Sequence, residues 1–228
     1  MIEIWQADLA SPTWDDARLC ELLSAGEIAQ ARRYHFESDR TRFVRRRAFR
    51  RLWLSHRLER PPESLRFVAG PQGKPSLHGV ADDIRFNCSA SGDQALLGFS
   101  MSGEVGVDVE QHRPMDADLA LVIERFSTDE RRALDGQSAA VRPRMFFECW
   151  ARKEAFVKAV GCGLSLPLDA FAVPLTPGAV AAAVRWTDDP VAGRRWWVTS
   201  LDVGPGASAA VAADQPSPVQ RYSWSWPP

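Results

Sequence analysis

Segments with strand periodicity and segments with helix periodicity alternate in two similar rounds along this 228-residue chain. Residues 1–9 alternate apolar and polar side chains, which is typical of a half-buried strand, and residues 13–36 and 38–56 carry helical patterns. Turn residues then separate further strand-like segments, which lie at 64–70, 84–91, 94–100 and 103–114. The first round therefore begins with a strand, continues with helices and closes with strands.

The second round begins after Pro114 with helical segments at 116–126 and 127–134, and the later one opens on a Ser127-x-x-Glu130 capping box. A long helix is expected from about Pro143 to Val160, and strand-like segments follow at 169–175, 181–188, 194–203, 207–214 and 221–228. The element order predicts an α+β fold with two similar halves, residues 1–112 and 113–228, related by a pseudo-twofold axis. The letters show no repeat, so the duplication rests on element order alone.

Composition narrows the classes of function. The net charge is −1, so no overall field attracts the protein to nucleic acid or to a membrane surface. The four cysteines are widely spaced and form no CxxC pair, which argues against a zinc cluster or a disulfide framework and favours a reducing compartment. The first residues do not read as a signal peptide, and no run approaches the ~20 apolar residues that span a bilayer. We expect a cytoplasmic protein without membrane contact.

Two acidic residues lie close together in the strand-like sequence GVDVE. Asp108 and Glu110 are two residues apart, so their side chains point to one face of a strand, while Val107 and Val109 point to the other. Neighbouring carboxylates repel each other unless water solvates them or a cation lies between them. Mg²⁺ takes oxygen ligands of this kind. For Asp108 and Glu110 considered alone, a strand with one solvated face is a more common explanation than a metal site.

The long helix adds Glu154 and Lys158, which are four residues apart and share a helix face. Phe147 and Trp150 lie on nearly the same side, which suggests that this face is partly covered. An exposed Glu–Lys pair is common and contributes only about 0.3–0.5 kcal/mol. In the alternative interpretation, Glu154 is a third oxygen ligand and Lys158, as a mobile point charge, contacts a phosphate.

The strand sequence GVDVE, the helix sequence WARKEAFVK and the continuation GLSLPLDAF form a pattern that is more specific together than apart. This pattern resembles the 4′-phosphopantetheinyl transferase superfamily, and its longer, Sfp-like branch in particular. Upstream, QGKP and FNCSAS are similar to the G-K-P and F-N-x-S-H-S sequences of that branch. The resemblance keeps the family's order from RRYHFESDRTR to about Val173.

The resemblance implies an enzyme that moves the 4′-phosphopantetheine arm of coenzyme A onto a serine of an apo acyl or peptidyl carrier protein and releases adenosine 3′,5′-bisphosphate. By match to the family's motifs, Asp108, Glu110 and Glu154 are expected to bind Mg²⁺, which would neutralise charge on the phosphates. Lys158 is expected to lie against the same phosphates as a catalytic residue. The carrier serine needs a base, and Glu154, a metal-bound water and Glu130 all stay open as candidates.

The resemblance also implies an active site at the interface of the two halves. The coenzyme A nucleotide would lie on the N-terminal half, and the metal-ligand helix and carrier-docking surface, around residues 119–126, on the C-terminal half; core packing explains that helix pattern equally well. The expected coenzyme A contacts are Arg42, Arg46, Arg47, Lys74, Pro75, Ser89, Asp108 and Lys158. The chain departs from the family at Ala90, which replaces the histidine of N-x-S-H-S, and at Glu27 and Gln30, where some members carry lysines that help to hold the 3′-phosphate.

Other functions stay open at this stage. The arginine-rich helix at 38–56 would suit a nucleic-acid-binding protein, but the chain is neutral overall and carries no recognition motif. A metal-dependent phosphodiesterase usually needs more carboxylates and histidines, and NCSASGD lacks the G-x-S-x-G sequence of serine hydrolases. Ala90 makes an inactive homologue that binds coenzyme A or a carrier protein the main alternative. We expect no nucleic-acid partner, and a monomer, because both halves of the site lie in one chain.

Overall fold

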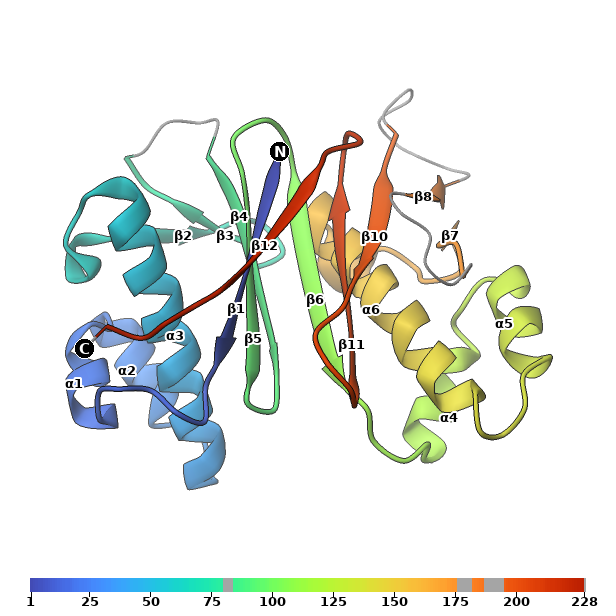
Figure 1. Ribbon diagram of the computed structural model, residues 1–228, viewed down its shortest axis with the longest axis horizontal. Helices are drawn as coiled ribbons and strands as arrows, with labels where there is room; N and C mark the ends of the chain where they lie inside the picture. Colours follow the sequence, from blue (N-terminus) through green and yellow to red (C-terminus); the bar gives the residue numbers. More distant parts are fainter. Residues whose placement is uncertain (80–83, 176–181, 187–194, 228) are drawn as a thin grey trace.

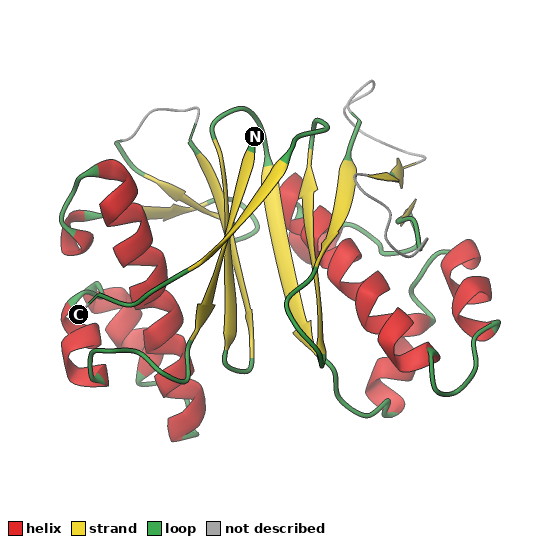
Figure 2. Cartoon of the chain, in the orientation of Figure 1, coloured by secondary structure: helices red, strands yellow, loops and turns green. Residues whose placement is uncertain are grey.

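Strands form the centre of the molecule and helices lie on both sides of them. The computed structural model describes residues 1–79, 84–175, 182–186 and 195–227 (Figure 1). In these residues, two four-stranded sheets have the strand orders β12-β1-β5-β4 and β6-β11-β10-β8. Figure 2 shows the strands in yellow between helices in red. The strands of the first sheet are β1 (Ile2–Asp8), β4 (Arg85–Ser91), β5 (Gln94–Ser100) and β12 (Val219–Ser223).

The second sheet and two small hairpins complete the β structure. The sheet consists of β6 (Val105–Gln111), β8 (Ala182–Ala183), β10 (Trp197–Leu201) and β11 (Ala207–Ala213). The hairpins pair β2 (Phe67–Ala69) with β3 (Pro75–Leu77), and β7 (Phe171–Ala172) with β9 (Arg185–Trp186). The strand expected at 181–188 is thus two short strands, and its first and last residues lie outside the described part of the chain.

Helix α3 (Glu37–Leu58) covers the first sheet, and α1 (Asp16–Glu21) and α2 (Ala25–Ala31) pack against α3. A short 3₁₀ helix η1 (Pro62–Ser64) follows α3. The prediction of one continuous helical segment at 13–36 is therefore wrong, because the segment forms two separate helices. Ser24 caps a new helix, because its side chain accepts from the Glu27 N–H while the Glu27 side chain accepts from the Ser24 N–H. This reciprocal capping separates α2 from α1.

Helix α6 (Arg142–Val160) lies on the second sheet and α5 (Thr128–Asp135) packs against α6, while α4 (Ala117–Ile123) contributes to the same core cluster. A 3₁₀ helix η2 (Gly163–Ser165) follows α6. The predicted capping box of Ser127 and Glu130 is confirmed. In α4, Leu119 and Ile123 are buried in the core, and Leu121 is exposed. Core packing therefore accounts for Leu119 and Ile123, and the carrier-docking surface around residues 119–126 stays a prediction.

The two sheets pack against each other through aliphatic side chains. Ile4 and Leu96 from the first sheet meet Val107, Val109 and Val211 from the second in one buried cluster. Since side chains alternate along a strand, the neighbouring acidic residues of β6 point the other way, toward α6. The predicted separation of valines and carboxylates onto opposite faces of this strand is confirmed.

β6 and α6 approach each other closely at Gly106. A Cβ atom added to Gly106 would lie 2.2 Å from the Ala155 carbonyl oxygen and 2.3 Å from the Ala159 nitrogen. Only glycine leaves room for this backbone-to-backbone contact. The first residue of the GVDVE motif therefore sets how near the acidic strand lies to the helix that carries Glu154 and Lys158.

The α+β class is confirmed, but two strands cross the predicted division at residue 112. β6 precedes that division and pairs with β11, while β12 at the end of the chain returns to pair in parallel with β1. The boundaries 1–112 and 113–228 and the pseudo-twofold axis stay predictions. Among the described residues, the helices are too short or too polar to span a membrane.

Candidate active site

The acidic strand β6 meets α6 beside β4, and three of the expected site residues contact one another there. Asp108 is 2% exposed, and its Oδ1 accepts hydrogen bonds from Ser89 Oγ at 2.8 Å and from Lys158 Nζ at 2.5 Å. Lys158 Nζ also donates to Ser89 Oγ at 3.0 Å. Ser89, Asp108 and Lys158 therefore form a closed set of contacts that joins β4, β6 and α6.

Glu110 lies two residues further along β6 and contacts α6 through a tryptophan. Its Oε1 accepts from Trp150 Nε1 at 3.0 Å, and its Oε2 accepts from Ser91 Oγ at 3.4 Å. The Trp150 ring stacks on Phe126 and Phe146, which orients the indole N–H. The sequence predicted Trp150 only as cover for the helix face, although its position four residues before Glu154 was a signal for a place in the site.

Burial raises the pKa of the three carboxyl groups assigned to metal binding. Burial, followed by the charge of Asp108, raises the pKa of Glu110 to about 7. The same two causes, in the same order, raise the pKa of Glu154. Burial also raises the pKa of Asp108, although the charge and hydrogen bond of Lys158 act in the opposite direction. These shifts show that the three groups share one electrostatic environment, in which a bound cation would favour their ionised forms.

The chemistry of these groups fits Mg²⁺. The donors are carboxylate oxygens, and Asp108 Oδ2 is buried without a hydrogen-bond partner in the described structure. However, across residues 1–79, 84–175, 182–186 and 195–227, no three His, Cys, Asp or Glu side chains converge closely enough to hold a metal ion. Asp108, Glu110 and Glu154 would have to move closer together to share a cation, so the Mg²⁺ site stays a prediction.

Two cavities, each of about 280 Å³, adjoin this carboxylate group and meet at Lys158. Pro75, Cys88 and Lys158 line both of them. The first, termed the glycine cavity, is lined by Gln72, Gly73, Lys74, Pro75, Asn87, Cys88, Glu154, Val157, Lys158, Gly161 and Gly163. The second, termed the arginine cavity, is lined by Arg46, Arg47, Phe49, Arg50, Pro75, Cys88, Ser89, Ala90, Ala95, Leu96 and Lys158.

Three arginines of α3 give the arginine cavity its charge. Arg46 Nη2 donates to the Tyr34 hydroxyl at 3.2 Å. The Nε atoms of Arg47 and Arg50 are buried without a partner among the described residues. Burial, followed by the charge of Arg46, lowers the pKa of Arg47, and burial and then Arg47 lower the pKa of Arg50 to about 10. A buried donor without a partner costs about 1–3 kcal/mol, so an anion bound here would stabilise both guanidinium groups.

Glu27 is the counter-ion of this arginine group. Its Oε1 lies 2.6 Å from Arg50 Nη2, and its Oε2 lies 2.7 Å from Arg51 Nη2. Burial by itself would raise the pKa of Glu27, but the Ser24 N–H and the two arginines together lower it. In the sequence, Glu27 was noted only as a position where some family members carry a lysine. Its pairing with Arg50 and Arg51 was not predicted, since these arginines lie 23 and 24 residues further along the chain.

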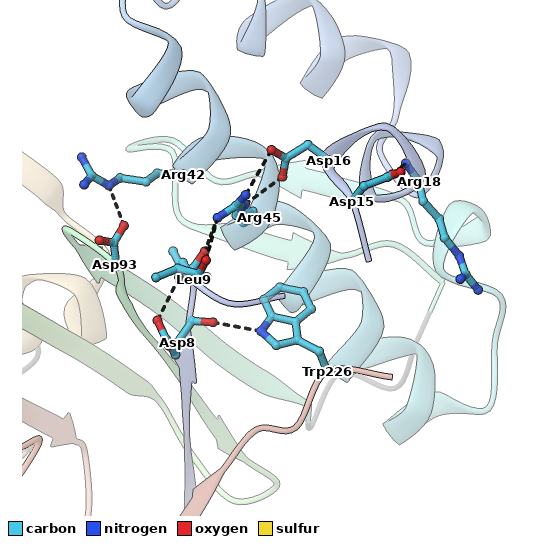
Figure 3. A network of polar contacts seen from close by, with 10 residues as sticks. Asp8, Leu9, Asp15, Asp16, Arg18, Arg42, Arg45, Asp93 and Trp226 are labelled. Carbon is cyan, nitrogen blue, oxygen red and sulfur yellow. Dashed lines mark hydrogen bonds and ion pairs between the residues drawn. The ribbon is translucent and has the colours of Figure 1, made fainter. Parts of the chain in front are cut away.

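Arg42 does not reach either cavity. Its Nε lies 2.8 Å from Asp93 Oδ1, in the turn between β4 and β5, and its side chain is 41% exposed (Figure 3). In the same view, Arg45 binds Asp16 and the Leu9 carbonyl oxygen. Arg42 and Asp108 are thus expected coenzyme A contacts that line neither cavity.

Lys74 and Pro75, two of the expected nucleotide contacts, line the glycine cavity. The Lys74 ammonium, however, already has two partners. Its Nζ lies 2.8 Å from Glu104 Oε2 and 2.8 Å from the carbonyl oxygen of Ala159, in the last turn of α6. The stem of Lys74 therefore forms part of the cavity wall, while its charge is shared with these two groups.

Glu130 lies in a buried polar network outside both cavities. Its side chain is 2% exposed, its Oε2 lies 2.8 Å from Lys153 Nζ, and its Oε1 accepts from the Val173 N–H at 2.8 Å. Lys153 Nζ also donates to the carbonyl oxygens of Leu168 and Phe171, at 2.7 and 2.9 Å. These contacts tie α5 and α6 to the segment after α6, so the arrangement supports a structural role for Glu130 and does not support its candidacy as the base.

Asn87 is a further residue of the site region that the sequence did not single out. Its Oδ1 accepts from the Val107 N–H at 3.0 Å, which satisfies a backbone donor of β6 from the neighbouring strand β4. The asparagine in FNCSAS was the available signal. This bond helps to hold Ser89 opposite Asp108.

Comparison with known proteins gives one consistent family. A family model described as the 4'-phosphopantetheinyl transferase superfamily matches residues 104–213. The chain is 31% identical over 201 residues to the 4'-phosphopantetheinyl transferase ffp of Bacillus subtilis, which covers 87% of this chain and 85% of that protein. It is 28% identical over 203 residues to the transferase Sfp of Bacillus subtilis, covering 89% and 87% of the two chains.

A third relative matches a shorter stretch more closely. The putative 4'-phosphopantetheinyl transferase slr0495 of Synechocystis is 38% identical over 147 residues, which is 63% of this chain and 59% of that protein. This match spans less than two thirds of the relative's own length.

Proposed function

This chain belongs to the 4′-phosphopantetheinyl transferase superfamily, and from that membership we propose that it moves the phosphopantetheine arm of coenzyme A onto a serine of an apo carrier protein. The observation that carries the proposal is the position of Lys158. It lies where the two cavities meet and contacts both Asp108 and Ser89. One cation is thus available to a phosphate in either cavity.

The proposed reaction is a phosphoryl-type group transfer. The serine Oγ of the carrier forms a bond to the phosphorus of the phosphopantetheine arm. The bond from that phosphorus to the bridging oxygen of the pyrophosphate breaks, and adenosine 3′,5′-bisphosphate leaves with the electron pair. The serine proton passes to a base. Positive charge near the bridging oxygen favours the transition state, because negative charge develops there.

Each part of the site has a role in this proposal. Lys158 would contact the phosphates, and the Arg46, Arg47 and Arg50 side chains would hold the 3′-phosphate in the arginine cavity. Ala90 lines that same cavity, so the arginines would take over the contact that a histidine makes elsewhere in the family. Mg²⁺ held by Asp108, Glu110 and Glu154 would supply further neutralisation of phosphate charge.

Glu154 is the base that the structure supports best. It lines the glycine cavity beside Lys158, and burial raises its pKa, which makes the carboxylate a better proton acceptor. Glu130 lines neither cavity and its oxygens are engaged by Lys153, Val173 and Ser127. We therefore assign the proton transfer to Glu154.

The proposal also covers the oligomeric state, the cellular compartment and the class of partner. Both cavities combine residues of β4, in the first sheet, with residues of α6, which supports a site between two halves of one chain and hence a monomer. Cys20, Cys88, Cys149 and Cys162 are unpaired, which supports a reducing cytoplasm. The arginine helix does not favour a nucleic-acid partner, because carboxylates of the chain already pair with several of its arginines.

The function is tested by incubating the protein with coenzyme A, Mg²⁺ and purified apo acyl and peptidyl carrier proteins. We expect the intact mass of at least one carrier to increase by one phosphopantetheine group, and a carrier whose acceptor serine is replaced by alanine to stay unchanged. If the protein binds coenzyme A but modifies no carrier, it is a non-catalytic homologue. If it does not bind coenzyme A, the proposal is wrong.

A further inference from the structure

Glu104, at the start of β6, joins three parts of the molecule through its two carboxylate oxygens. Its Oε2 lies 2.8 Å from Lys74 Nζ, and its Oε1 lies 2.9 Å from Arg85 Nε. The Lys74 ammonium continues the chain of contacts to the Ala159 carbonyl oxygen at 2.8 Å. Glu104 thereby connects the turn between β2 and β3 with β4 and with the last turn of α6.

The turn that carries Lys74 lies directly on the segment that follows α6. A Cβ added at Gly161 would lie 3.4 Å from Lys74 Cδ, and one added at Gly163 would lie 3.2 Å from Gln72 Cβ. Both glycines have positive φ, 82° and 56°, which side chains other than glycine rarely adopt. Both segments line the glycine cavity. Their relative position therefore shapes that cavity.

We propose that Glu104 is a positioning residue that holds the β2–β3 turn against the end of α6, through Lys74, in the position that coenzyme A binding requires. The inference rests on the proposed function and adds a residue to it. Glu104 does not line the cavity and does not need to touch the ligand. Its carboxylate, about a quarter exposed, is shielded enough to form a directional contact. The pKa of Glu104 is lowered overall by Lys74 and Arg85 despite its burial, so the group is charged at neutral pH.

A positioning role of Glu104 and a direct role of the Lys74 ammonium in phosphate binding predict opposite effects of a Glu104 substitution on coenzyme A affinity. If Lys74 existed to contact a phosphate, Glu104 would compete with that phosphate for its charge. Removing the Glu104 charge would then free the ammonium and tighten coenzyme A binding. If Glu104 positions the turn, removing its charge loosens the cavity wall and weakens binding. The sign of the change therefore separates the two roles.

The test compares Glu104→Gln with the parent by calorimetry of coenzyme A and by transfer kinetics. We expect the Kd and the KM for coenzyme A to rise about tenfold, with kcat at saturating coenzyme A within about twofold of the parent. Glu104→Asp should recover part of the loss. Lys74→Met should weaken binding to a similar extent, and the double variant should be no weaker than either single variant, because both changes break the same link.

Asp16→Asn is the matched control, because it breaks another ion pair of the first half, between Asp16 and Arg45, away from both cavities (Figure 3). Its coenzyme A affinity should equal that of the parent. Tighter binding by Glu104→Gln, or additive losses in the double variant, would overturn the inference. A parent that does not bind coenzyme A would instead contradict the proposed function. If Glu104→Gln does not fold, Lys74→Met and Arg85→Gln test the same link, and parental affinity in both would overturn the inference.

Discussion

Replacing Gly106 by alanine should separate β6 from α6 and so disturb the fold and the site together. The added Cβ would lie 2.2 Å from Ala155 O and 2.3 Å from Ala159 N, where ordinary contacts lie at 3.4–4 Å. Both atoms belong to the helix backbone, so no change of side-chain rotamer relieves the contact. The strand and the helix must move apart by about 1 Å or more.

The magnitude follows from the rigidity of the two elements. Overpacking a core costs about 1–3 kcal/mol, and a contact with backbone atoms belongs at the upper end, so we expect a loss of about 3 kcal/mol in the free energy of unfolding. Asp108 and Lys158 lie on the two elements that separate, and their 2.5 Å contact would lengthen. We expect the transfer rate to fall at least about tenfold, which corresponds to ~1.4 kcal/mol in the barrier.

Urea denaturation and the carrier transfer assay measure the two effects of Gly106→Ala. Gly26→Ala on α2 is the control, since Gly26 is exposed and an added Cβ there has Ser24 Oγ at 4.0 Å as its nearest contact. That change should stabilise the protein by about 0.5–1 kcal/mol, because alanine favours the helix. If the free energy of unfolding of Gly106→Ala stays within about 0.5 kcal/mol of the parent, the close approach of β6 and α6 does not restrict this position to glycine.

Further predictions concern the charged groups. Glu27→Gln removes the carboxylate that binds Arg50 and Arg51, so the free energy of unfolding at pH 7 should fall by about 3 kcal/mol. Despite burial, the pKa of folded Glu27 lies below its ordinary 4.5, so this contribution is present above that pH and is lost as the pH falls through the folded pKa. Urea curves of parent and variant should therefore converge in acid, and a gap that does not change with pH would contradict the assignment. Lys158→Ala should weaken coenzyme A binding and slow transfer. Lys158→Arg should recover only part of both losses, because a planar guanidinium does not replace a point charge. If Lys158→Ala keeps the parental affinity and rate, Lys158 serves only as the ion-pair partner of Asp108. Arg47→Met should reduce the calorimetric preference for coenzyme A over 3′-dephospho-coenzyme A, because Arg47 lines the arginine cavity and its Nε has no partner among the described residues. An unchanged preference would assign Arg47 to folding alone.

Much of the fold could be predicted where the periodicity was strong. The strand pair at 84–91 and 94–100 and the long helix ending at Val160 agree with β4, β5 and α6. The break between α1 and α2 depends on a local signal, the reciprocal capping of Ser24 and Glu27, that the helical pattern of 13–36 obscured. The parallel return of β12 to β1 could not be predicted, because pairing between the two ends of the chain leaves no local pattern.

The same distinction holds for the candidate site. The alternation of GVDVE and the four-residue spacing of Glu154 and Lys158 are local rules, and they correctly predicted which faces the side chains share. The partners that hold Arg42 and Glu130 away from the cavities, Asp93 and Lys153, come from long-range packing. A motif therefore identified the residue types, and only the fold decided which of them line the cavities.

We propose that Asp108 belongs to the reacting site and that its contact with Lys158 serves transfer more than folding. The most direct test is the transfer rate of Asp108→Ala to an apo carrier, measured with coenzyme A and Mg²⁺ beside a thermal unfolding curve. We expect the rate to fall at least about 100-fold while a cooperative unfolding transition is retained, because Lys158 is partly exposed and water can solvate it when its partner is removed. Transfer at the parental rate by a folded Asp108→Ala would contradict the account.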